Sequence, residues 1–128
     1  MDKELHDKGL AVRKAVLGAE HVERSLKTAD NFNLPFQQLV TEYCWGAVWT
    51  REGLSRQSRS ILNLGMLSAL GRSHELKLHI RGALNNGLTR DEIREVFMQV
   101  AIYCGVPAAV ESFRCAREVF AEIDGKKP

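Results

Sequence analysis

The sequence predicts an all-α protein, a compact bundle of six or seven helices. Apolar residues recur with a helical period along nearly the whole chain, and no segment shows the alternation of a β-strand. Two of the three prolines, Pro35 and Pro107, stand where helices are expected to begin. A chain of 128 residues can bury about two-thirds of its unfolded surface, so we expect one domain covering 1–128.

The N-terminal part contains three predicted helices. The first covers about 3–17 and stops at Gly18, a weaker pattern covers 20–29, and a turn through Pro35 leads into the third. The apolar face expected for the first helix is Leu5, Val12, Ala15 and Val16. The third helix has the i, i+3, i+4 spacing of a buried face, at Phe36, Leu39, Val40, Tyr43, Cys44, Ala47 and Val48.

The next predicted helix, about 56–70, is apolar nearly all round from Ile61 to Leu70. Such a helix is buried on most faces, inside the domain or against another subunit, so we expect an oligomer. Gly71 ends it, and Ser73 is the expected cap of a helix over 74–86 that Gly87 terminates.

Two further helices complete the bundle. Thr89 and Glu92 have the spacing of a capping box, which opens a helix running to about Cys104. Gly105 interrupts the apolar pattern, and Pro107 restarts it in a last helix. The apolar face of that last helix is Ala109, Phe113, Ala116 and Phe120.

Composition excludes several classes of protein. The net charge of +2 gives no reason to expect binding to nucleic acid or to a membrane surface, and no segment is apolar enough for a bilayer span. The first residues lack the apolar core of a secretory signal. Three cysteines, an odd number without close spacing, fit reduced thiols in the cytoplasm.

The familiar cofactor and nucleophile motifs are missing. There is no glycine-rich phosphate loop, no Cys-x-x-Cys, no His-Glu-x-x-His and no Gly-x-Ser-x-Gly. His74 and His79 are five residues apart, about 140° around a helix, so one regular helix does not aim both at one metal. We therefore expect neither a metal nor a cofactor.

His79 is the histidine best placed for chemistry. It follows Leu76 by three residues and precedes Ala83 by four, so it faces inward, with Glu75 and Arg72 one and two turns earlier. A His–Glu pair of this kind can act as a general acid or base, with Glu75 fixing the tautomer of the imidazole. The more frequent alternative is a partly buried histidine satisfied by one carboxylate, and spacing alone leaves both open.

Arginines gather around this region, and together they can hold an anionic small molecule, although any single one more often belongs to a solvated face. They are Arg51, Arg56, Arg59, Arg72 and Arg81. Trp45 and Trp49 are four residues apart, which is more often packing than a ligand wall. Cys104, at the end of a helix, is more often a core thiol than a nucleophile.

Several segments together resemble the carboxymuconolactone decarboxylase family, and in particular its γ-carboxymuconolactone decarboxylase branch. The resemblance covers nearly the whole chain. Its segments are 12–18, Trp45-Gly46-Ala47-Val48-Trp49 with Arg51, 59–64, 75–81, 85–93 and Ala101-Ile102-Tyr103-Cys104-Gly105-Val106-Pro107. The resemblance implies an alkyl hydroperoxidase D-like fold and a ring-shaped homo-oligomer, a hexamer, with sites at subunit contacts.

The peroxidase members of that superfamily have a glutamate, eleven residues, Cys-x-x-Cys and a histidine four residues further on. Counting back from His79 places Glu75 and Arg72 at the two cysteine positions and Ser60 at the glutamate position. Reduction of a peroxide by a dithiol needs both thiols, so this activity is disfavoured.

The resemblance implies a cofactor-free carboxy-lyase that converts γ-carboxymuconolactone to 3-oxoadipate enol-lactone in protocatechuate catabolism. We expect His79 to donate a proton or stabilise the enolate, with Glu75 orienting it and Ser60 donating a hydrogen bond. Arg72 is expected to bind the small anionic lactone. Residues expected to assist it are Arg51, Arg59 and Trp45.

Two positions depart from the decarboxylase pattern. Decarboxylases of the branch often carry histidine where this chain has Tyr43 and Gln99. These departures keep open an enzyme of the same fold that acts on another unsaturated lactone or a keto acid. A non-catalytic, oligomeric binding or stress protein built on the same helices is a further alternative.

Overall fold

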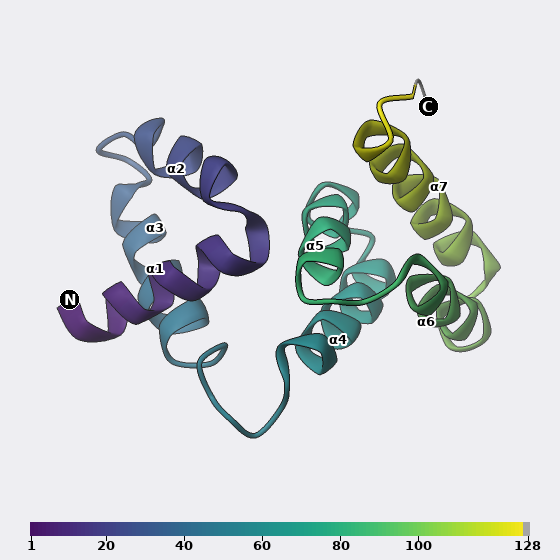
Figure 1. The fold of residues 1–128 in the computed structure, drawn as a ribbon, viewed down its shortest axis with the longest axis horizontal. Coiled ribbons are helices and arrows are strands. Elements are labelled where there is room, and N and C mark those ends of the chain that lie inside the picture. Colours follow the sequence, from purple (N-terminus) through teal and green to yellow (C-terminus); the bar gives the residue numbers. More distant parts are fainter. Residues whose placement is uncertain (127–128) are drawn as a thin grey trace. The chain divides into compact units, whose positions relative to one another are not determined.

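The computed structural model describes residues 1–126, and within them every regular element is helical (Figure 1). This confirms the predicted all-α class. The described residues fall into two compact units, 1–56 and 57–126, which we describe one at a time. The elements are α1 (Lys3–Leu17), α2 (Ala19–Lys27), α3 (Leu34–Leu39), the π-helix η1 (Val40–Gly46), α4 (Arg56–Leu70), α5 (Ser73–Asn85), α6 (Arg90–Tyr103) and α7 (Val106–Ile123).

The first unit is built on the packing of α1 against η1. Asp2 caps α1 by accepting a hydrogen bond from the backbone of Leu5 at 3.1 Å. The buried side of α1 is Gly9, Val12, Arg13 and Val16, so the expected apolar member Ala15 instead lies exposed. The buried hydrophobic residues that form this core are Val12, Val16, Trp45 and Trp49.

The expected single helix from Phe36 is two segments, a short α3 followed by η1. In a π-helix the hydrogen bonds close over five residues, which turns later side chains away from the face that a regular helix would present. The buried residues of η1 are accordingly Thr41, Trp45 and Gly46. The predicted face is wrong for Phe36, Leu39 and Tyr43, which are 61%, 58% and 70% exposed.

The second unit contains α4 to α7 around one hydrophobic core. Phe97 of α6 and Phe113 of α7 meet edge to face, with ring centroids 5.7 Å apart, and every helix of the unit contributes buried residues. The buried core consists of Leu64, Leu76, Ile80, Ala83, Leu88, Ile93, Phe97, Val100, Ala109, Cys115, Ala116 and Val119.

The helix α4 is buried on one side within the chain. Ser60, Leu64 and Ser68 are the buried residues, at a spacing of four. Ile61, Leu62 and Met66, which the sequence led us to expect as buried, are at least 40% exposed and line an open apolar groove together with α6. This apolar side of α4 is therefore not covered by the described part of the chain.

Local signals for helix ends are largely confirmed. Thr89 and Glu92 form the reciprocal capping box of α6, Gly87 and Gly105 have positive φ values of 95° and 99°, and Pro107 lies in the first turn of α7. The N-cap of α5 is Arg72, not Ser73 as expected. None of the helices in residues 1–126 is long and apolar enough to cross a membrane.

Candidate active site

Helices α4 and α5 bring polar side chains together in the second unit. On α4, Ser60 is fully buried and Asn63 follows it by one turn. On α5, Leu76 and Ile80 anchor the helix in the core, and His79 lies beside them on the inward side, as predicted. The hydrophobic anchors therefore fix the direction in which this histidine points.

The imidazole of His79 is held next to an amide. The Nδ2 atom of Asn63 lies 3.3 Å from the Nδ1 atom of His79. Burial lowers the pKa of His79 to about 4, whereas the negative charge of Glu75 acts in the opposite direction. His79 is therefore a neutral imidazole at pH 7, able to donate one hydrogen bond and accept another.

Ser60 has a defined partner as well. The amide of Asn86, which directly follows α5, donates a hydrogen bond of 2.8 Å to the Oγ atom of Ser60. Because Oγ accepts this hydrogen bond, the hydroxyl proton of Ser60 remains available as a donor. The side chains of two helices thus supply a hydroxyl group and a neutral imidazole within one unit.

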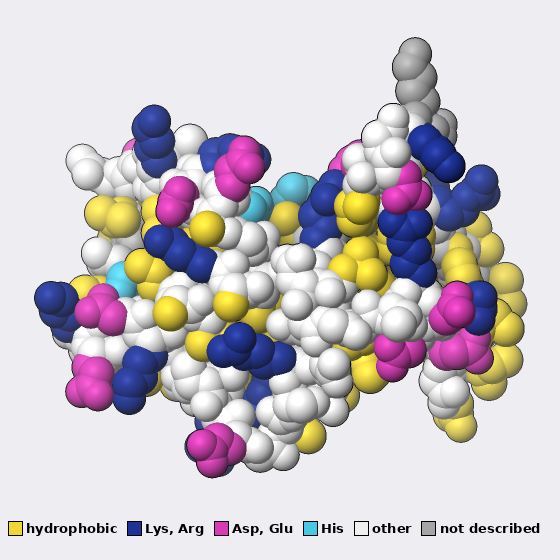
Figure 2. Space-filling view, viewed as in Figure 1, with side chains coloured by type: hydrophobic (Ala, Val, Ile, Leu, Met, Phe, Trp, Pro, Cys, Tyr) yellow, Lys and Arg dark blue, Asp and Glu magenta, His cyan; other side chains and the backbone are white. Residues whose placement is uncertain are grey.

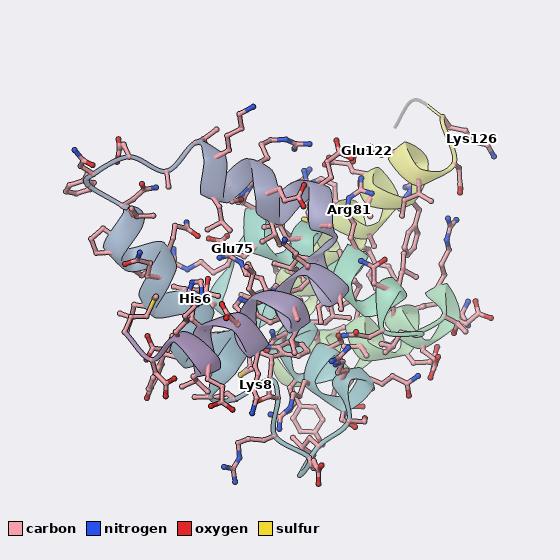
Figure 3. All side chains as sticks on the ribbon, turned by 60° about the vertical axis from the view of Figure 1, so that its left-hand side comes forward. His6, Lys8, Glu75, Arg81, Glu122 and Lys126 are labelled. Carbon is pink, nitrogen blue, oxygen red and sulfur yellow. The ribbon has the colours of Figure 1, made fainter. Side chains whose placement is uncertain are left out.

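The three residues expected on one stripe of α5 are not all helical. Arg72 is the N-cap, with φ −92° and ψ 73°, and its side chain is exposed. Glu75 lies in the first turn and is exposed as well; Figure 3 labels it on the same helix as Arg81. Glu75 acts on His79 through its charge, and the nitrogen Nδ1 faces Asn63.

The remaining predicted arginines differ in their surroundings. Arg59 is half-buried on α4, next to Ser60 in sequence. Arg51 belongs to the first unit and is exposed, where it lines a shallow pocket of about 350 Å³ that includes Lys8 and Arg56. This pocket is cationic, which suits an anion, but a role for Arg51 or Arg59 in substrate binding remains a prediction.

Trp45 is a buried member of the first unit's core. Its ring stacks on Trp49 at a centroid distance of 4.8 Å and an interplanar angle of 25°. Trp45 is 4% exposed and Trp49 is 6% exposed. Packing accounts for this pair within the first unit, and a role for Trp45 as an apolar wall of the site also remains a prediction.

Sequence reasoning missed two members of the site, Asn63 and Asn86. A signal for the first was present, because Asn63 lies one helical turn after Ser60 and so points to a similar side of α4. Asn86 stands directly before Gly87, and the sequence marks this position only as the end of a helix. Both residues belong to the site through contacts between separate elements. Asn63 contacts His79, 16 residues away, and Asn86 contacts Ser60, 26 residues away.

The thiols do not form a redox centre in the described structure. Cys44, Cys104 and Cys115 are all free. Burial raises the pKa of the Cys44 and Cys115 thiols, which disfavours the reactive thiolate. Within residues 1–126 no cluster of three or more His, Cys, Asp or Glu residues could hold a metal ion.

The fold and the site define an all-α protein whose candidate centre combines a neutral histidine with a buried hydroxyl group. The model of the carboxymuconolactone decarboxylase family matches residues 35–118, and the chain belongs to this family. This confirms the resemblance drawn from the sequence.

Curated relatives agree with this assignment. The chain is 42% identical to a 4-carboxymuconolactone decarboxylase from Acinetobacter baylyi, over 95% of this chain and 91% of that protein. It is 48% identical to nitrosuccinic acid decarboxylase npaB from Metarhizium robertsii, over 98% of this chain and 88% of that protein. A 4-carboxymuconolactone decarboxylase from Pseudomonas putida matches over 35% of this chain at 42% identity. The protein is accordingly a carboxy-lyase.

Proposed function

We propose that this carboxy-lyase converts γ-carboxymuconolactone to 3-oxoadipate enol-lactone in protocatechuate (β-ketoadipate) catabolism. The observation that carries the proposal is 42% identity to a 4-carboxymuconolactone decarboxylase over 95% of the chain. The neutral His79 beside Asn63 supports it, since the reaction needs a hydrogen-bond donor at an oxygen that becomes negative.

The reaction has an electron sink in the substrate itself. The bond between the γ carbon and its carboxylate breaks, CO2 leaves, and the electron pair moves through the ring double bond to the lactone carbonyl oxygen. The resulting dienolate takes up one proton from solvent to give the enol-lactone. The substrate ring stores the charge, so the reaction requires neither a metal nor a cofactor.

We assign the chemical roles as follows. His79 donates a hydrogen bond to the developing enolate oxygen, and a donor of this kind is worth about 3–4 kcal/mol in the transition state. Ser60 is the second donor. The negative charge of Glu75 raises the pKa of His79 and so partly offsets the effect of burial. Arg72 binds the spectator carboxylate. Residues that contribute to substrate binding together with Arg72 are Arg51, Arg59 and Trp45.

The departing carboxylate needs different surroundings. An ion pair with that group would stabilise the ground state and would be lost as CO2 forms, so it would slow the reaction. Arginine contacts confined to the spectator carboxylate, with the departing group in a less cationic place, satisfy both requirements.

We further propose that the enzyme is a cytoplasmic homo-oligomer, a hexamer, with its sites near subunit contacts. Figure 2 shows hydrophobic side chains on the surface over the C-terminal helices. Ile102, Tyr103 and Val106 are 79%, 79% and 64% exposed in the single chain. Such a set of exposed apolar residues is typical of a surface that another protein covers.

A second candidate substrate is an acyclic nitro dicarboxylate. The relative named nitrosuccinic acid decarboxylase is 48% identical over 98% of the chain, which favours this alternative. A carboxylate on the carbon that bears a nitro group can leave as CO2, because the nitro oxygens accept the electron pair as a nitronate. The same donors would serve this reaction, since negative charge again develops on an oxygen.

A direct assay separates the two candidates. γ-Carboxymuconolactone is generated in place from β-carboxymuconate by a lactonising enzyme, nitrosuccinate is offered in a parallel reaction, and both products are followed by NMR against blanks without the protein. We expect turnover of the lactone that His79→Ala abolishes. Turnover of nitrosuccinate alone would identify the second candidate as the substrate. If neither compound were turned over, both proposed substrates would be wrong.

A further inference from the structure

The side chain of Asn63 makes a contact that the sequence did not lead us to expect. Asn63 lies on α4 and His79 on α5, and their side chains approach to 3.3 Å between Nδ2 and Nδ1. Both residues are only partly exposed. With the amide nitrogen facing Nδ1, the amide is the donor and Nδ1 the acceptor, which is the arrangement that suits the Nε2–H tautomer.

A neutral imidazole has one proton to place. When Nδ1 accepts a hydrogen bond, the proton must be on Nε2, so the partner of one nitrogen decides the chemistry of the other. We propose that Asn63 is a positioning residue that holds His79 as the neutral Nε2–H tautomer, making Nε2 the hydrogen-bond donor for the oxygen that becomes negative during decarboxylation.

This proposal rests on the proposed function, and it narrows the role of His79 to one of the two that the sequence left open. An imidazolium would be a proton donor to carbon. The surroundings of His79 disfavour that form, because burial lowers its pKa to about 4 and a donor at Nδ1 further stabilises the neutral ring. His79 therefore stabilises the enolate by a hydrogen bond, and solvent protonates the carbon.

The orientation of the amide is the decisive feature. With the amide turned by 180°, its oxygen would face Nδ1 and would select the opposite tautomer, with the proton on Nδ1. The two arrangements give different ¹⁵N spectra. A nitrogen that carries a proton and one that only accepts have well-separated chemical shifts, so the tautomer can be measured without turnover.

The test uses the ¹⁵N-labelled full chain at pH 7.5, with the signals of His79 assigned by their absence in His79→Gln. We expect a protonated Nε2 and a bare Nδ1 in the wild type. In Asn63→Asp a carboxylate accepts a hydrogen bond from Nδ1, so the proton moves to Nδ1. Asn63→Leu introduces a side chain without a hydrogen-bonding group. We expect it to remove the preference for one tautomer of His79 and to give a mixture of the two.

Kinetics complete the test. Asn63→Asp is expected to lower kcat by about 100-fold with a small change in KM, as expected for a histidine held in the wrong tautomer. Asn31→Asp makes the same chemical change at an exposed turn and is the control for added charge. Thermal unfolding of each variant establishes that the protein is folded.

The outcomes are distinguishable. A wild type with the proton on Nδ1, or a tautomer that is unchanged in both Asn63 variants, overturns the role of Asn63 even if the enzyme is active. An Nε2–H tautomer that depends on Asn63, in a protein that decarboxylates neither candidate substrate, supports the positioning role and removes the proposed function.

Discussion

Gly9 of α1 lies directly against Gly46 of η1. A Cβ atom built on Gly9 would stand 2.6 Å from the backbone nitrogen of Gly46 and 2.1 Å from the carbonyl oxygen of Thr41. All of these neighbours are backbone atoms, which cannot rotate away as the end of a side chain can. The close packing of α1 against η1 therefore requires glycine at position 9.

Gly9→Ala is expected to destabilise the protein by about 3 kcal/mol, because α1 and η1 must move apart to admit the methyl group. The free energy of unfolding is measured by urea titration. Gly53→Ala is the matched control, since a Cβ atom at Gly53 meets nothing within 4 Å. Equal stability of the two variants would contradict the packing described here.

The neutral state of His79 makes stability depend on pH. The pKa is about 4 in the folded protein against 6.5 for the unperturbed group, so between these values the unfolded chain binds a proton that the folded chain does not. The free energy of unfolding therefore falls as pH decreases from about 6.5 to 4. His79 accounts for a total decrease of about 3 kcal/mol in the free energy of unfolding, and most of this decrease has occurred by pH 4.5.

The measurement is urea unfolding at pH 7 and pH 4.5 for the wild type and for His79→Gln. Protonation of carboxylates affects both proteins, so the difference between their pH dependences isolates His79. The wild type is expected to lose more stability than the variant on acidification. Parallel losses would mean that His79 is not held neutral by burial.

The hydrogen bond between Ser60 and Asn86 has a structural and a chemical role that can be separated. Ser60→Ala removes a buried acceptor, and we expect a loss of about 1–2 kcal/mol. A double-mutant cycle with Asn86→Ala is expected to show coupling of about 1 kcal/mol. A fall of about tenfold in kcat for Ser60→Ala, absent in Asn86→Ala, would identify the hydroxyl as a donor to substrate.

The sequence predicted helix positions better than helix faces. Gly87, Gly105 and Pro107 act locally through backbone geometry, so their effects are visible in sequence. The inward face of η1 was not predictable from a period of 3.6, because the π-helix changes that period. The apolar residues that mimicked a buried stripe, such as Phe36 and Tyr43, are exposed in the single chain.

In the candidate site, too, features of a single helix were predictable from sequence and contacts between helices were not. His79 was identifiable because it shares an inward face with Leu76, and that property belongs to a single helix. Its contact with Asn63 depends on how α4 packs against α5, and no pattern within one helix carries that information. Tertiary packing places an amide 3.3 Å from Nδ1, whereas sequence spacing suggests the carboxylate of Glu75 as the partner of the imidazole.

Arg72 provides the last prediction, on substrate binding. Its side chain is exposed at the start of α5, and none of the ion pairs found in residues 1–126 involves it, so its charge is available to a carboxylate. Arg72→Gln is expected to raise KM about tenfold with little change in kcat, because contact with a spectator carboxylate is the same in the ground and transition states. The wild-type KM should also rise with salt. Arg94→Gln, which removes an exposed arginine paired with Asp91, is the matched control. A fall in kcat at unchanged KM would instead place Arg72 at the oxygen that becomes negative.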